Sequence, residues 1–227
     1  MAFYIPTRKL DDWRKLLASP RKQWKPGRSA KLCAETWSTA NGFPNEVREA
    51  LNDSKIELFM DLEFLMGFPE FQVNLPPSGH ASQNDIWIMA RSTKINELVS
   101  ITVECKVDES FGKPVREWLG KKPSGKPKRL EYICKRLGIN SDEAQDIRYQ
   151  LLHRTVSSLE MSDKLCCRNA LMMVNSFSED DAGFDDYSKF CDLLGCKAEI
   201  NRIVKTTRQS GRNLFLGWVK IECVPSK

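Results

Sequence analysis

The sequence contains few histidines and no long apolar segment. Only two histidines, at positions 80 and 153, occur in 227 residues, and the eight cysteines form no C-x-x-C pair. This combination disfavours a structural zinc site, which needs closely spaced thiolate and imidazole ligands. No apolar run approaches the roughly 20 residues that cross a membrane, and the N-terminus lacks the apolar core of a signal peptide. We therefore expect a cytoplasmic protein with no membrane partner and with reduced, mostly buried cysteines.

Internal repeats and low-complexity tracts are also absent. The proportions of hydrophobic residues, 41%, and of charged residues, 29%, are those of an ordinary globular protein that can bury a substantial core. The net charge of +5 allows an anionic partner without requiring one. We expect a single domain over residues 1–227, with a helical extension over residues 1–45 packed on it.

The most informative part of the sequence is QNDIWIMARSTKINELVSITVECKVDESFG, residues 83–112. Apolar and polar residues alternate over 85–91 and again over 98–108, which predicts two strands joined by a polar turn. On the second strand Glu104 and Lys106 project to the same face. A carboxylate and an ammonium in mid-strand are costly unless they are paired or used.

These polar residues have the chemistry of a divalent metal site. The carboxylates of Asp85 and Glu104, together with the main-chain carbonyl of Cys105, offer hard oxygen ligands suited to Mg²⁺ or Mn²⁺. Lys106 can position a water molecule and stabilise charge on a phosphodiester, and Asp108, next on the same face, can hold Lys106 or a second ion. The alternative interpretation is a structural ion pair between Glu104 and Lys106 on an exposed sheet face.

The same residues resemble a known signature. Asp85, a spacer of 18 residues and then Glu104-Cys105-Lys106 at the end of an apolar strand are similar to the D…(D/E)xK pattern of the PD-(D/E)XK nuclease superfamily, with Asn84 where that superfamily usually has Pro. Further segments resemble an uncharacterised prokaryotic family assigned to the superfamily, and together they cover most of the chain: WKPGRSA (24–30), SQND (82–85), VECKVDESFG (103–112) and RYQLLHRT (148–155). The resemblance implies a restriction-endonuclease-like fold and a metal-dependent nuclease site, but it brings no established substrate.

Two further contributions to the site follow from the resemblance and the pattern. The superfamily commonly adds a carboxylate from the helix before the first strand, for which Glu57, Asp61 and Glu63 are the candidates. Glu63 is the one chosen, although a solvated helix face explains any of the three more simply. Gln83, two residues before Asp85, is expected to support the site. Gln150, His153 and Arg154 form a polar stripe at helical spacing that could line the cleft and orient Lys106. For His153 the alternative is a structural histidine bonded to a neighbouring element.

Periodicity and turn residues predict an α/β layout with a mixed sheet flanked by helices. The expected helices are 10–18, 29–39, 44–67, about 128–137, 141–167 as one helix or a pair, and 185–194. The expected strands are 71–75, 85–91 and 98–108 as an antiparallel meander, 170–176 as a buried strand parallel to one neighbour, and 213–224 at an edge.

Two basic segments are candidates for phosphate contact. The first, RKQWKPGR over 21–28, places Arg21, Lys22, Lys25 and Arg28 in a loop, for which a solvated loop is the favoured interpretation. The second follows the acidic strand and is expected to neutralise a nucleic acid there, although a solubilising surface loop has the same composition. Its candidate residues are Lys113, Arg116, Lys121, Lys122, Lys126, Lys128 and Arg129.

Taken together, these features predict a Mg²⁺- or Mn²⁺-dependent nuclease that acts on nucleic acid, as a DNA endonuclease, with a homodimer as one assembly that could cut both strands. Two other classes stay open at this point. One is a protein that keeps the nuclease fold but only binds nucleic acid or another protein, and the other is an enzyme with a different kind of substrate.

Overall fold

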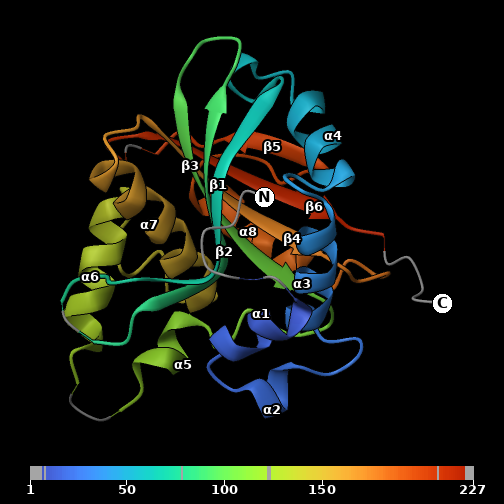
Figure 1. The fold of residues 1–227 in the computed structure, drawn as a ribbon. Helices are drawn as coiled ribbons and strands as arrows, with labels where there is room; N and C mark the ends of the chain where they lie inside the picture. Colours follow the sequence, from blue (N-terminus) through green and yellow to red (C-terminus); the bar gives the residue numbers. More distant parts are fainter. Residues whose placement is uncertain (1–6, 8, 78, 122–123, 209, 223–227) are drawn as a thin grey trace.

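A six-stranded mixed sheet lies between two layers of helices in the computed structural model, which describes residues 7, 9–77, 79–121, 124–208 and 210–222 (Figure 1). The helices are α1 (Leu10–Leu16), α2 (Pro20–Gln23), α3 (Ser29–Thr39), α4 (Asn45–Asp53), α5 (Val115–Leu119), α6 (Lys126–Leu137), α7 (Tyr149–Lys164) and α8 (Phe184–Leu193), with a 3-10 turn at Glu57–Phe59. The strands are β1 (Leu62–Val73), β2 (Ser82–Ser92), β3 (Leu98–Lys106), β4 (Asn169–Ser176), β5 (Arg202–Lys205) and β6 (Asn213–Lys220). The predicted α/β class is confirmed.

The strand order is β1-β2-β3-β4-β6-β5. The first three strands form the predicted antiparallel meander, and β4 is parallel to both of its neighbours, β3 and β6. The prediction that the last strand lies at an edge is wrong, because β5 pairs antiparallel with its outer side. With only four residues, β5 is too short to give a clear alternation in the sequence.

The predicted helix over 44–67 is also wrong beyond its first part. Helix α4 ends at Asp53, and the chain then passes Lys55 and Asp61, which both have positive φ, before β1 begins at Leu62. Pairing with β2 extends β1 through Val73, so the short strand expected over 71–75 is only its end. Apolar residues over 56–65 fit a period of 3.6 as well as a period of two, and pairing with the neighbouring strand decided between them.

Each face of the sheet is covered by its own helices. Helices α6, α7 and α8 pack on the face that carries Trp87 and Trp218, whereas α1, α3 and α4 pack on the face that carries Ile88 and Ile101 (Figure 1). The N-terminal helices therefore contribute to the core through buried residues such as Trp37. At the carboxyl end of β3 the two layers approach one another, and the polar site lies there.

Two expectations about composition can be compared with the described residues. The seven cysteines among them are free thiols, and five of these are buried; Cys223 lies outside the described residues. In the same part of the chain, no helix combines the length and apolarity needed to span a bilayer.

Candidate functional site

Asp85 and Glu104 lie at the same end of two neighbouring strands. The antiparallel pairing of β2 with β3 ends at Ile86 and Val103, and Asp85 and Glu104 are the next residues on the two strands. Oδ2 of Asp85 also accepts a hydrogen bond of 2.6 Å from the main-chain N–H of Cys105. The acids predicted from the signature are therefore brought together.

These residues line one cavity of about 270 Å³, here called the acid cavity. It lies between the segment that joins α2 to α3 on one side and the N-terminal turns of α7 on the other. Its walls are Lys22, Gln23, Arg28, Ser29, Ala30, Asp85, Glu104, Cys105, Lys106, Glu109, Gln150 and Arg154. Both layers of helices thus contribute to a site whose acids come from the sheet.

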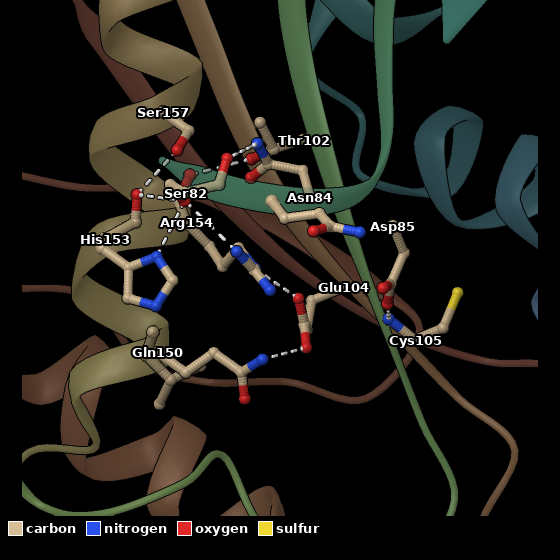
Figure 2. A network of polar contacts seen from close by, with 12 residues as sticks. Ser82, Asn84, Asp85, Thr102, Glu104, Cys105, Gln150, His153, Arg154 and Ser157 are labelled. Atoms are coloured by element: carbon tan, nitrogen blue, oxygen red, sulfur yellow. Dashed lines mark hydrogen bonds and ion pairs between the residues drawn. The ribbon is translucent and has the colours of Figure 1, made fainter. Parts of the chain in front are cut away.

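Glu104 is the centre of a buried polar network (Figure 2). Its Oε1 lies 2.8 Å from Nζ of Lys106 and also accepts a hydrogen bond from Gln150, while its Oε2 accepts from Nε of Arg154 at 2.5 Å. Lys106 in turn donates to Oε1 of Gln150 at 3.0 Å. Glu104 is 2% exposed and Lys106 6%, so this ion pair is not the exposed surface pair of the alternative interpretation.

Asp85 and Glu104 have opposite pKa shifts. Burial and the charge of Glu104 raise the pKa of Asp85 to about 7, despite the opposing effects of Arg154 and Lys106. Burial acts on Glu104 as well, but the charges of Arg154 and Lys106 outweigh it and hold the pKa of Glu104 below its ordinary value. Glu104 is consequently ionised at neutral pH, whereas Asp85 gains or loses its proton near neutral pH.

A third acid, Glu70, was missed by the sequence analysis. It lies on β1 between Pro69 and Phe71, whose partners on β2 flank Asp85. Burial and the charge of Asp85 raise the pKa of Glu70 to about 8, and Oε2 of Glu70 accepts a 2.7 Å hydrogen bond from Gln83. Its φ of 51° is uncommon for a residue with a side chain. An acid within the apolar run FPEF was the available signal, of the same kind as Glu104 in β3.

Glu63, by contrast, lies elsewhere. It belongs to β1 rather than to a helix, and its exposed carboxylate pairs with Arg91 at 2.7 Å. Asp108 is exposed and does not line the acid cavity. The neighbouring Glu109 does, accepting hydrogen bonds from the N–H of Val107 at 2.9 Å and the hydroxyl of Ser29 at 3.2 Å. Strand β3 ends at Lys106, so the alternation that placed Asp108 beside Lys106 no longer applies there.

The polar stripe of α7 does face β2 and β3 (Figure 2). Besides the contacts of Gln150 and Arg154 with Glu104, Nδ1 of His153 lies 2.7 Å from the hydroxyl of Ser82, which also accepts a hydrogen bond from Arg154 at 3.2 Å. Burial, followed by the charges of Arg154 and Arg129, holds the pKa of His153 well below its ordinary value. His153 is thus a neutral residue bonded to a neighbouring strand, and it does not line the acid cavity.

The candidate basic residues divide between the acid cavity and other parts of the surface. Of the seven candidates over 113–129, the six that the structure describes do not line the acid cavity, and Lys122 lies outside the described residues. Arg116 pairs with Asp146, and Lys126 and Arg129 line a neighbouring pocket. Lys22 and Arg28, from the loop expected to be merely solvated, line the acid cavity instead.

The donor set of the acid cavity suits a hard divalent cation. Among the described residues no group of three or more His, Cys, Asp or Glu side chains is arranged to hold a metal ion. Two carboxylates and the Cys105 carbonyl would be the protein ligands, with Glu70 close to them, and Mg²⁺ commonly binds through one or two carboxylates. The raised pKa values of Asp85 and Glu70 indicate buried acids without enough compensating positive charge, which a bound cation would supply.

One comparison with known proteins gives a match. The sequence profile of a family described as "Domain of unknown function (DUF6946)" matches residues 6–223. Neither the curated proteins nor the solved structures include a match.

Proposed function

The chain belongs to the DUF6946 family, a domain of unknown function, and from the geometry of the acid cavity we propose that it is a Mg²⁺- or Mn²⁺-dependent nuclease that cuts DNA as an endonuclease. One observation carries the proposal. Asp85 and Glu104 lie at the same end of two adjacent strands and line a single cavity together with Lys106. A restriction-endonuclease-like fold, a cytoplasmic location and a homodimer belong to the same proposal.

The side chains divide the work of phosphodiester hydrolysis between them. Asp85, Glu104 and the Cys105 carbonyl would hold the cation, which would supply Lewis acidity toward the phosphodiester. Lys106 has an ammonium group that can bind a phosphate oxygen or orient the attacking water. Water adds to phosphorus, the bond from phosphorus to the leaving oxygen breaks, and a proton passes to that oxygen.

Positive charge around the cavity supports an anionic substrate. Lys22 and Arg28 are exposed at its wall, where they can contact phosphates that flank the reacting group. Arg154 and Gln150 are positioning residues, because they hold Glu104 rather than face solvent. This arrangement fixes the acid and the amine in one geometry before substrate binds.

A second candidate function is favoured by a specific observation. Both oxygens of Glu104 already have protein partners, namely Arg154 on one and Lys106 with Gln150 on the other. A carboxylate saturated in this way is also what a purely structural network would contain. On this reading the chain keeps the fold and binds nucleic acid or a protein without turnover.

A cleavage and binding assay separates the two. Plasmid, linear and single-stranded DNA are incubated with the protein in Mn²⁺ or in EDTA, and binding is measured in parallel. An enzyme requires the metal and loses cleavage in Lys106→Ala while still binding, whereas Lys189→Ala, an exposed lysine on α8, is the matched control. Binding that is equal in EDTA, with no cleavage of any substrate in Mn²⁺ or Mg²⁺, would establish the non-catalytic function instead.

A further inference from the structure

A second pocket lies beside the acid cavity and has a different chemistry. It encloses about 420 Å³, and we call it the aromatic pocket. Its aromatic and basic lining residues are His80, Trp118, Lys126, Arg129, Tyr149 and His153. None of its lining residues is acidic, so the pocket combines flat aromatic surfaces with positive charge.

The aromatic rings form a continuous series. Trp118 of α5 stacks on Tyr149 of α7 with ring centroids 3.6 Å apart and planes 10° apart, and Tyr149 lies 4.8 Å from the ring of His153. Trp118 and Tyr149 are both partly exposed. A stack at the surface of a pocket offers a platform on which a further planar group can lie.

The cations of the pocket are close to these rings. Nζ of Lys126 lies 5.2 Å from the centroid of the Trp118 ring and donates to the carbonyl oxygen of Trp118. The buried Nε of Arg129 has no hydrogen-bond partner among the described residues. A buried donor without a partner is costly, and an acceptor on a ligand would satisfy it.

The two sites are separated by less than two turns of helix α7. Tyr149 and His153 line the aromatic pocket, whereas Gln150 and Arg154, each one residue further along, line the acid cavity. Gln150 and His153, one from each site, are three residues apart, and side chains at this spacing on a helix have Cβ atoms about 5–6 Å apart. A polymer with its phosphodiester in the acid cavity would therefore place a neighbouring unit at the aromatic pocket.

From this juxtaposition we propose that the aromatic pocket binds an unpaired nucleobase of the nucleic acid whose phosphodiester occupies the acid cavity. The base stacks on the Trp118–Tyr149 platform, and Arg129 and Lys126 bind its acceptor groups or the adjoining phosphate. Stacking tolerates any base, since every base has a π-face. The inference deepens the proposed function by naming the substrate form as single-stranded or locally unpaired nucleic acid, and it rests on that function for the role of the acid cavity.

Binding measurements without turnover test the pocket. Lys106→Ala protein in EDTA is titrated into a labelled single strand and into a blunt duplex of the same sequence. Trp118→Ala is expected to weaken single-strand binding at least about fivefold, the lower end of a stacking contribution, with less than a twofold change for the duplex. Trp118→Phe, which keeps a stacking ring, should stay within about twofold of the parent. Unchanged single-strand binding by a folded Trp118→Ala protein would overturn the proposal.

A second pair of variants covers the case in which Trp118→Ala does not fold. Arg129→Met removes the unpartnered donor, and Lys135→Met removes an exposed cation on the same helix outside the pocket. Only Arg129→Met should weaken single-strand binding, and equal effects of the two variants would overturn the proposal. Deoxyadenosine monophosphate is a further probe: if it binds as tightly as the oligonucleotide, the pocket is a free-nucleotide site and the inference fails. Loss of binding in Trp118→Ala without metal-dependent cleavage by the parent enzyme would uphold the pocket while refuting the nuclease.

Discussion

Nε of Arg154 lies 2.5 Å from Oε2 of Glu104, and both side chains are buried. Strand β3 carries the acid, while the guanidinium reaches it from α7, 50 residues further along the chain. Removing Arg154 leaves the buried Glu104 with Lys106 as its remaining counter-ion, so part of the charge compensation is lost. The pair therefore couples the packing of α7 to the state of the acid cavity.

Arg154→Met is expected to lower the free energy of unfolding by about 3–5 kcal/mol, the usual cost of breaking a buried ion pair from one side. The losses from Arg154→Met and Glu104→Gln should be less than additive in the double variant, because either single change already breaks the direct pair. Urea unfolding of the parent, the two single variants and the double variant measures this coupling. A single-variant loss below about 1 kcal/mol, as in an exposed pair, would contradict the buried pairing.

Asp85→Asn is expected to stabilise the metal-free protein at pH 8 while abolishing cleavage. The pKa of Asp85 is raised to about 7, so above that pH the folded state must carry a charge that the cavity disfavours. The amide removes this charge. In a chain of this length each kcal/mol raises Tm by about 2–4 °C. Asp108→Asn, at an exposed site outside the cavity, is the control and should leave both Tm and cleavage unchanged.

Stabilisation of the protein by Mn²⁺ should increase from pH 6 to pH 8. Asp85 and Glu70 have pKa values raised to about 7 and about 8, so at pH 6 protons compete with the cation for these acids. The increase in Tm on adding Mn²⁺ to EDTA-treated protein measures the effect at each pH. It should disappear in Glu104→Gln, and a pH-independent increase would mean that Mn²⁺ binds elsewhere.

His153 should make the folded state less stable as the pH falls below about 6.5. Its folded pKa lies well below the ordinary value, so the unfolded chain binds the proton first and acid favours unfolding, by up to roughly 1.4 kcal/mol per pH unit. Asp85 and Glu70 act in the opposite direction over a similar range, since their folded pKa values are raised. The measurement is therefore the difference in urea stability between the parent and His153→Gln at pH 7.5 and at pH 5.5. An equal stability difference at the two pH values would contradict the role given to His153.

Lys22→Ala is expected to weaken DNA binding and to reduce its salt dependence. If Lys22 neutralises one phosphate, the slope of log K against log[salt] falls by about 0.7–0.9. Lys121→Ala removes an exposed cation outside both the acid cavity and the aromatic pocket and should leave the slope unchanged. A larger effect of Lys121→Ala than of Lys22→Ala would place the DNA on the basic loop that the sequence favoured.

Local patterns were sufficient for much of the fold. Alternation over 85–91 and 98–108 predicted the strands that became β2 and β3, and periodicity with turn residues predicted helix α3 with its observed bounds. They failed over 54–67, where apolar residues fit two periods equally well. Pairing with β2, which involves residues far along the chain, selected the strand.

For the site, the sequence by itself determined which residues have the right chemistry and that Glu104 and Lys106 share a face, because side-chain direction follows from strand geometry. Only the tertiary structure decided which other groups join them. The pairing of β2 with β3 brought Asp85 and Glu104 to one cavity. The path of β1 brought Glu70 near and left Glu63 in solvent, and the packing of α7 supplied Arg154. The physical reason is that burial, which fixes the pKa values and the partners of these acids, is set by contacts between elements and not by neighbours in the sequence.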